Sequence, residues 1–228
     1  AAGFAIAERM TAQVRGLNMA TKNANDGLSM LATIENATND VTDMLHRMRE
    51  LAVQAANDTN SATDRGYLQT EVTALIAEID RVASDTKYNG TAVLDGTFTS
   101  KKLQVGTEAA QSITFSVSDV DATALAVNAA DISTQAGAAT ALTSISAAIE
   151  TVAGQRATYG ALQNRLEYTV SNLMNVSEFT QAARSRIEDA DFAAESARLS
   201  KAQVLQQTGT AMLAQANASQ QLALSLFR

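Results

Sequence analysis

Apolar side chains recur every three or four positions along the first quarter of the chain. From Met10 to Leu31 the steps alternate between four and three residues, which is the spacing of a coiled-coil seam. One further three-residue step leads to Ile34, and the same spacing then continues to Ala55. The pattern predicts one helix over residues 1–57. At about 1.5 Å per residue such a helix is ~84 Å long, almost twice the ~45 Å diameter of a compact globule of this chain length, so an elongated molecule is expected.

A polar stretch at residues 57–64 separates this helix from the next one. Asn, Asp, Ser and Thr dominate the stretch, and these residues favour turns. Ser61 and Asp64 have the spacing of a capping box, which marks the start of a helix. Four-and-three spacing of apolar residues resumes directly afterwards. The sequence therefore predicts a second helix over residues 62–86.

The middle of the chain has the alternation typical of short strands and the composition of a loop. Asp95 and Gly96 lie between short apolar runs, and this dipeptide is a common hairpin turn. Apolar and polar residues alternate around Leu103 and again around Ile113, which predicts two short strands. Residues 119–137 are rich in Ala, Asp, Thr and Gly and are expected to form a loop.

A third helix is predicted over residues 138–183, where one apolar stripe runs from Leu142 to Phe179. Charged residues then become frequent at 184–192. We expect this charged stretch to be a joint, followed by a last helix that continues to the end of the chain.

These elements predict a mainly α fold. The expected architecture is an elongated antiparallel rod of long helices, similar to a coiled-coil bundle, with a small β-hairpin element at one tip and a separate C-terminal helix. The rod domain is expected at residues 1–189, including the β element and a variable loop at about 91–137. The C-terminal helix is expected at residues 190–228.

The C-terminal helix has an apolar face and no charged residue between Lys201 and Arg228. Its leucines are Leu199, Leu205, Leu213, Leu222 and Leu226. Because the stripes of the other helices already pair with one another, this face is expected to pack against a helix outside the chain. The alternative is that the segment is a core helix of a bundle formed by this chain alone.

Composition and charge exclude several classes of function. The net charge is −7 and the pI is about 4.7, with basic residues scattered along the chain, so neither nucleic acid nor an anionic membrane is expected as a target. There is no cysteine, which excludes disulfides and thiolate chemistry. No uninterrupted apolar run reaches the ~18 residues of a membrane span.

Residues that could carry catalysis are sparse. His46 is the one histidine, and without grouped ligands around it a metal site is not expected. Glu188, Asp189 and Asp191 form a carboxylate cluster, but Arg184 lies four residues before Glu188, the spacing of an ion pair on a helix. We therefore predict a protein that is not an enzyme and that holds no metal or cofactor.

Both ends of the chain resemble bacterial flagellin. The N-terminal part contains AAGFAIAERM, RGLNMATKNANDGLSM and RMRELAVQAANDTN. The C-terminal part contains NRLEYTVSNLMNVSEFTQAARSRIEDADFAAESARLSKAQVLQQTGTAMLAQAN and ends in LALSLFR. The first ten residues carry no helix-start signal, and the resemblance implies a fragment that lacks the family's first forty or so residues.

The resemblance implies a structural subunit of the flagellar filament, secreted by type III export and found in the extracellular filament that drives swimming. Its implied partners are other flagellin subunits, hook-associated and cap proteins, and an export chaperone that binds the C-terminal helix. The leucines listed above would then contact the chaperone or the filament core. A hook–filament junction protein is the alternative, because it shares the helical ends.

The resemblance also implies a host partner, Toll-like receptor 5. The positions that match the family's receptor contacts are Arg47, Leu51 and, on the second helix, Glu71. From its spacing relative to Met48 and Ala52, Leu51 is expected off the seam and exposed, beside Arg47, with the composition of a small binding hot spot.

Overall fold

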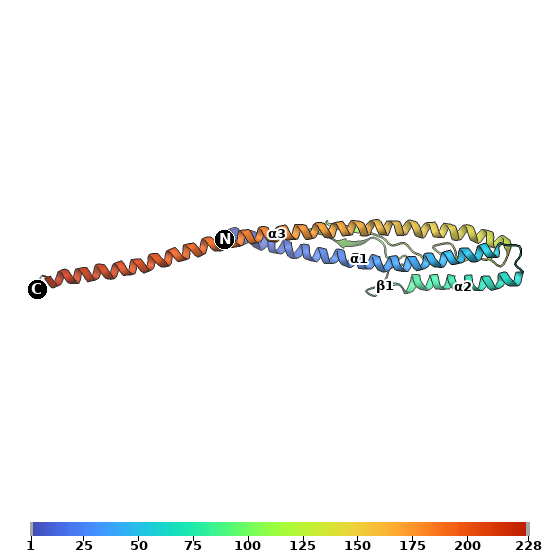
Figure 1. The fold of residues 1–228 in the computed structure, drawn as a ribbon, viewed down its shortest axis with the longest axis horizontal. Coiled ribbons are helices and arrows are strands. Elements are labelled where there is room, and N and C mark those ends of the chain that lie inside the picture. The colour runs from blue at the N-terminus through green and yellow to red at the C-terminus, as the bar shows by residue number, and fades with distance from the viewer. Residues whose placement is uncertain (1, 227–228) are drawn as a thin grey trace. The chain divides into compact units, whose positions relative to one another are not determined.

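The computed structural model describes residues 2–226, with side chains for residues 3–190 and 192–221. In chain order the elements are α1 (Ala2–Ala55), α2 (Ala62–Asp85), β1 (Lys87–Tyr88), β2 (Thr91–Ala92), β3 (Lys101–Gln104), β4 (Ser112–Phe115) and α3 (Gln135–Leu226), which can be followed by colour in Figure 1. The chain is therefore mainly helical, with two small antiparallel strand pairs. Its contacts divide it into a larger unit, Gly16–Asn175, and a smaller unit made of Ala1–Arg15 and Val176–Arg228.

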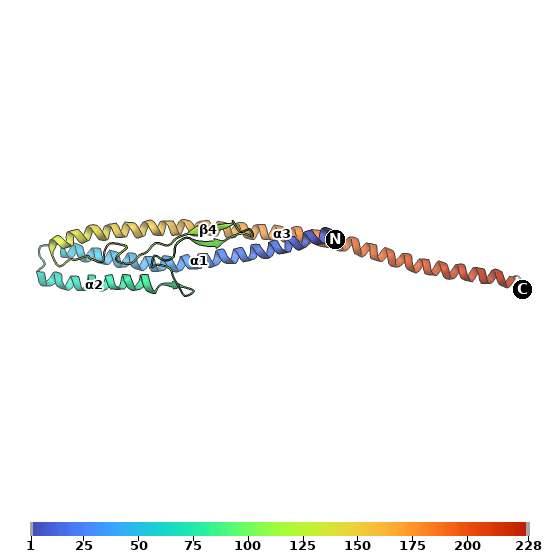
Figure 2. The ribbon, with the colours of Figure 1, turned by 180° about the vertical axis from the view of Figure 1, so that it is seen from behind.

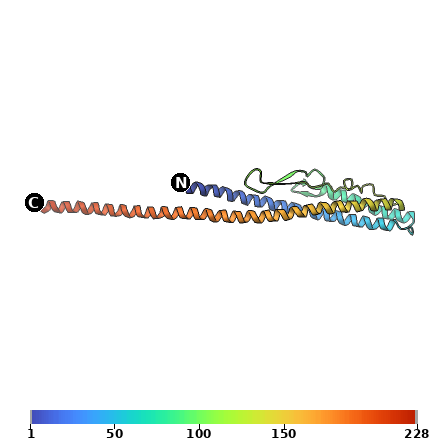
Figure 3. The same cartoon turned by 90° about the horizontal axis from the view of Figure 1, so that it is seen from above.

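The larger unit is an elongated bundle in which parts of α1 and α3 lie side by side and α2 packs against them (Figures 1 and 3). The predicted seam of α1 is confirmed from Ile34 to Ala55, because every seam position in this range is buried. Val72 and Ile79 contribute the buried face of α2, and Ile145, Val152 and Leu166 contribute that of α3. The three predicted helical stripes thus form one continuous hydrophobic core.

The prediction that Leu51 is exposed is wrong. Its side chain is 1% exposed and belongs to this core. The two-position seam of a coiled coil is too narrow a description for α1, which meets two helices. A helix with two neighbours buries a wider stripe, so a position beside the seam is covered as well. Leu51 lies three residues after Met48 and four before Ala55, both fully buried, and falls within that wider stripe.

The connection from α1 to α2 is fixed by polar side chains. Ser61 caps α2, and its reciprocal hydrogen bonds with Asp64 form the predicted capping box. Arg65 donates hydrogen bonds to the Ala55 and Asn57 carbonyl oxygens at 2.7 and 3.0 Å. These contacts satisfy carbonyl groups at the end of α1 that have no partner within the helix.

The β structure agrees with the prediction in one pair of strands and differs in the other. β3 and β4 pair antiparallel, with Leu103 opposite Ile113. The hairpin turn, however, is formed by Asn89 and Gly90 between β1 and β2, and the Asp95–Gly96 dipeptide does not join two paired strands. Asn–Gly supports a two-residue hairpin turn at least as well as Asp–Gly. Here it follows β1, which begins two residues after the end of α2.

The β3–β4 pair lies against the helices of the larger unit (Figure 2). The Asn23 side-chain amide on α1 donates a hydrogen bond to the Gln104 carbonyl oxygen at 3.0 Å. Leu103 lies directly over Gly27, where an added Cβ would approach Leu103 Cδ1 to 2.5 Å. A glycine at this position of α1 therefore allows the close approach of β3.

Residues 119–133 form no helix or strand, as predicted, yet they contribute to the core. The buried members are Val120, Ala122, Leu125, Val127, Ala130 and Ile132. Two polar side chains of α2 hold this segment: Gln69 pairs with the backbone of Ala130 and Ile132, and Asp80 accepts a hydrogen bond from the Ala122 amide at 2.8 Å. The loop is thus an irregular layer of the bundle.

The expected joint at residues 184–192 is wrong, because α3 continues through it to Leu226. The charged residues support the helix: Arg184 pairs with Glu188 at 3.8 Å, at the predicted spacing of four. No Gly or Pro interrupts this stretch. The two compact units divide between Asn175 and Val176, within α3.

In the smaller unit, the start of α1 pairs with a short part of α3. Ala7 and Val14 are buried, as is Ser177 on α3. Arg184 Nη1 donates a hydrogen bond to Thr11 Oγ1 at 3.3 Å. From residue 192 to residue 221 every side chain of α3 is exposed.

Candidate functional site

The first candidate site is the exposed part of α3 at residues 192–221, which we call the tail helix. Leu199, Leu205 and Leu213 are 59%, 61% and 65% exposed, whereas Leu166 on the same helix is fully buried. Val204 and Met212 are exposed as well. The side chains of Leu222 and Leu226, predicted to extend the same face, lie outside the described residues.

An exposed apolar face of this length marks a binding surface, because monomeric proteins rarely leave large apolar patches in contact with water. Around the helix, Leu205, Met212 and Leu213 fall on one side by their spacing. The ion pair nearest to them, Arg198 with Glu195 at 3.7 Å, lies at the beginning of the tail helix. Over most of its length this surface therefore consists of apolar and uncharged polar side chains.

Among the described residues one helix, Gln135–Gln221, is long and apolar enough to cross a membrane by length and composition alone, and a core helix of a globular protein can meet the same criterion.

The second candidate site lies where α1 meets α2. Arg47 Nε donates a hydrogen bond to Glu71 Oε1 at 2.7 Å, and Arg47 Nη1 contacts Glu50 Oε2 at 3.1 Å. The three side chains are 50%, 44% and 68% exposed. The hydrogen bond that Arg47 donates to the Glu71 carboxylate is the largest cause of the raised Arg47 pKa. The guanidinium is thus held in one orientation on an accessible surface.

Leu51 lies beneath this surface and does not form part of it. The structure brings together two of the three residues predicted to contact a receptor, Arg47 and Glu71, and places the third in the core. Glu50 joins this pair through its ion pair with Arg47.

The candidates for chemistry remain isolated. His46 lies in a shallow groove lined by Arg49, Glu50 and Val53. Within the part of the chain that the structure describes, no three His, Cys, Asp or Glu side chains are grouped so that they could hold a metal ion. Glu188 pairs with Arg184, and the side chain of Asp191 lies outside the described residues.

Comparison with known protein families decides between the classes of function that remain. Residues 1–99 match the bacterial flagellin N-terminal helical region, and residues 142–227 match the bacterial flagellin C-terminal helical region. The chain belongs to the bacterial flagellin family. Flagellins are structural proteins of the bacterial flagellum, whose filament is extracellular.

Individual flagellins support this assignment over the whole chain. A flagellin of Halalkalibacterium halodurans is 43% identical over all of this chain and 85% of its own length. The crystal structure of Bacillus cereus flagellin is similar with a TM-score of 0.60 and 33% identity, covering 67% of this chain and 88% of that one.

A flagellar hook-associated protein from Vibrio parahaemolyticus is also similar in structure. Its TM-score is 0.68 over 79% of this chain and 95% of that one, but the sequences are only 15% identical. This similarity shows a shared fold and no more. The chain shares more sequence identity with these flagellins than with this hook-associated protein. This difference favours the flagellin assignment over the hook–filament junction alternative.

Proposed function

We propose that this flagellin is a structural subunit that polymerises into the flagellar filament for swimming, and that the tail helix is a principal assembly surface. The observation that carries the proposal is the exposure of every described side chain from residue 192 to residue 221, in a family that forms filaments. An apolar helix of this length gains little stability alone in water. Packing against a helix of another subunit would remove its leucines from solvent.

The proposed assembly role is tested by placing a charge on the apolar side of the tail helix. In the source bacterium, with its own flagellin gene deleted, the full-length flagellin gene that contains this sequence should restore filaments and swimming. The double variant Leu205→Lys and Leu213→Lys should restore neither, because an ammonium group buried in an apolar interface costs several kcal/mol, about 10³-fold in affinity or more.

Gln207→Lys provides the matched control, since residue 207 lies on the opposite side of the same helix from Leu205 and Met212. This variant introduces the same charge and should keep its filaments. Normal filaments from the double leucine variant would contradict the proposal.

We further propose that an export chaperone covers the tail helix before assembly, and that hook-associated and cap proteins contact the assembled subunits. Support for the chaperone comes from the same exposed leucines, which would be prone to aggregation in a subunit that waits for secretion. A helical chaperone with an apolar groove would suit Leu199, Leu205 and Leu213.

A second candidate function is that of a monomeric ligand for Toll-like receptor 5. The observation in its favour is the Arg47–Glu71 pair, an exposed charged surface with a fixed guanidinium. Arginine is frequent among interface hot spots. The burial of Leu51 changes the expected role of that residue, which would support the surface from below rather than contact the receptor.

Reporter cells that express the receptor test this second function. Arg47→Ala should raise the half-maximal dose more than tenfold, since truncating a hot-spot residue costs ~2 kcal/mol or more. Arg49→Ala is the matched control on the same helix, with one weak side-chain contact to Ser146 at 3.4 Å. Equal doses for both variants and the unmodified protein would count against the receptor surface.

A further inference from the structure

The turn between β1 and β2 consists of two residues with left-handed backbone conformations. Asn89 and Gly90 have φ angles of 49° and 78°. They connect strands in which Lys87 pairs with Ala92 and Tyr88 pairs with Thr91. Both turn residues are exposed. This is the Asn–Gly form of the two-residue hairpin turn.

The side-chain amide of Asn89 makes no hydrogen bond with any of the described residues. Comparable side chains in other turns of the chain are held. Asp95 Oδ1 accepts hydrogen bonds from the amide and hydroxyl groups of Thr97 at 3.1 and 2.6 Å. Asn60 donates to the Gln54 carbonyl oxygen at 2.6 Å. The Asn89 carboxamide is thus free to rotate toward the backbone that follows it.

The backbone that follows Asn89 is also unshielded. A Cβ placed on Gly90 would have no heavy atom within 4 Å. Gly90 itself has no side chain to crowd its nitrogen. The sequence contains Asn–Gly at this position alone.

We propose that Asn89 is a site of spontaneous deamidation. The deprotonated Gly90 nitrogen attacks the Asn89 Cγ carbon, a carbon–nitrogen bond forms, and the side-chain carbon–nitrogen bond breaks to release ammonia. The resulting five-membered succinimide then adds water. Opening at one carbonyl gives aspartate, and opening at the other gives isoaspartate, so no oxidant or enzyme is required.

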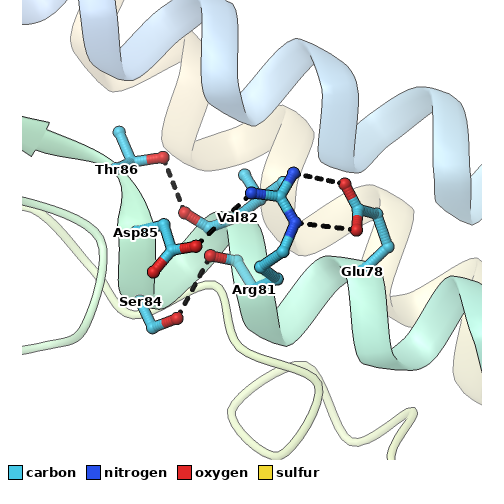
Figure 4. A network of polar contacts seen from close by, with 6 residues as sticks. All are labelled: Glu78, Arg81, Val82, Ser84, Asp85 and Thr86. Carbon is cyan, nitrogen blue, oxygen red and sulfur yellow. Dashed lines mark hydrogen bonds and ion pairs between the residues drawn. The ribbon is translucent and has the colours of Figure 1, made fainter.

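The structure separates a fixed base of this hairpin from its reactive tip. At the base, Thr86 contacts the Val82 carbonyl oxygen through both its amide and its hydroxyl group, at 3.1 and 2.6 Å. Figure 4 shows that Arg81, in the same turn of α2, bridges Glu78 and Asp85. Beyond this base each strand has only two residues. Local opening of so short a ladder is easy, and it gives the turn the freedom that ring closure needs.

Deamidation changes both the charge and the length of the turn. It adds one negative charge to a chain whose net charge is −7. Isoaspartate also places an extra methylene in the backbone, which no longer matches the two-residue turn and should break the β1–β2 pairing. The reaction does not depend on the proposed assembly function, and the larger unit's core contains no residue of the turn.

The test follows the folded protein during incubation at mildly alkaline pH and physiological temperature. Residues 88–101 form one tryptic peptide, which contains Asn89 and no other asparagine. Digestion below neutral pH and mass spectrometry should show this peptide converting at least about tenfold faster than any peptide whose asparagines lie in α3, a difference of ~1.4 kcal/mol in activation free energy. Isoaspartate should be the main product, detectable by enzymatic methylation of its carboxylate.

Two comparisons make the result decisive. Gly90→Ala keeps the side-chain amide of Asn89 and adds a Cβ beside the attacking nitrogen, so conversion should slow. Asn89→Gln leaves residue 90 unchanged but requires a larger ring for the attack, so conversion should slow as well. The unmodified chain is also incubated in urea. If the peptide converts in urea but stays intact in the folded protein, the turn protects Asn89 and the proposal is wrong.

Discussion

Leu51 and Val53 stand two residues apart on α1 in opposite environments. Leu51 is 1% exposed and Val53 is 53% exposed. Leu51→Ala should therefore lower the free energy of unfolding by about 2–5 kcal/mol, because it leaves a cavity in a closely packed core. Val53→Ala should change it by less than about 0.5 kcal/mol. Urea unfolding followed by circular dichroism measures both, and equal midpoints would show that Leu51 is not packed as described.

Leu51 also illustrates which part of the site was predictable. Heptad spacing identified Met48, Ala52 and Ala55 correctly. It could not reveal how many helices surround α1, and this number decides how wide the buried stripe is. By contrast, the pairing of Arg47 with Glu71 joins two helices at a contact that no sequence spacing specifies. The family resemblance named both residues as receptor-contact positions but did not predict that they pair.

The capping box of α2 predicts a dependence of stability on pH. Hydrogen bonds from the hydroxyl and backbone amide of Ser61 lower the pKa of Asp64 in the folded protein. A lowered folded pKa means that the stabilisation is present above the ordinary pKa of aspartate, about 3.9, and is lost as the pH falls through the lower folded value. Ser61→Ala should reduce this loss in acid.

At neutral pH, Ser61→Ala should cost about 1 kcal/mol of stability, as for other N-cap serines. Ser84→Ala is a suitable control, because Ser84 donates its hydroxyl hydrogen to the Arg81 carbonyl oxygen and touches no carboxylate (Figure 4). Thermal unfolding across the acidic range would disprove the account if both variants kept the same pH dependence as the unmodified chain.

Among the elements, α3 combines two regions with different stability. Its part in the larger unit carries Ile145, Val152 and Leu166 in the core, whereas the tail helix buries no described side chain. Most of the stability of a helix in a protein comes from tertiary packing of its apolar face, which the tail helix lacks. Amides of residues 192–221 should exchange hydrogen much faster than those around Leu166. Hydrogen-exchange mass spectrometry of the isolated chain measures this, and equally slow exchange would mean that the tail helix is stable without a partner.

Periodicity predicted these elements well where helices bury one stripe, and poorly elsewhere. The ends of α1 and α2 fell within two residues of the prediction because polar caps mark them. The segment 119–133 was expected to be a loop. Its six buried side chains recur at alternating steps of two and three residues, which match neither the period of a strand nor that of a helix, so its place in the core was not visible. The joint expected near Arg184 is absent from α3, because charged residues four positions apart form ion pairs that stabilise a helix.

At the scale of the whole molecule, the described residues separate stability from assembly. Every buried side chain falls between Ala7 and Ser177, and none lies in the tail helix. The same chain thus supplies its own core from one set of residues and leaves another set for partners. This separation is what a subunit requires if it must fold before its neighbours are present.

A truncated chain ending at Asp191 tests that separation. It loses the tail helix but no buried residue, so its unfolding midpoint should match that of the full chain, while its helical circular dichroism falls with the residues removed. A chain ending at Asn164 is the contrasting variant: it also loses Leu166 and Leu173, two side chains at most 7% exposed. Removing two buried leucines should cost about 4 kcal/mol or more, and its midpoint should fall clearly below that of the longer truncation. If the chain ending at Asp191 unfolded as early as the one ending at Asn164, the tail helix would be part of the stabilising core, and its proposed role as a surface reserved for other subunits would have to be abandoned.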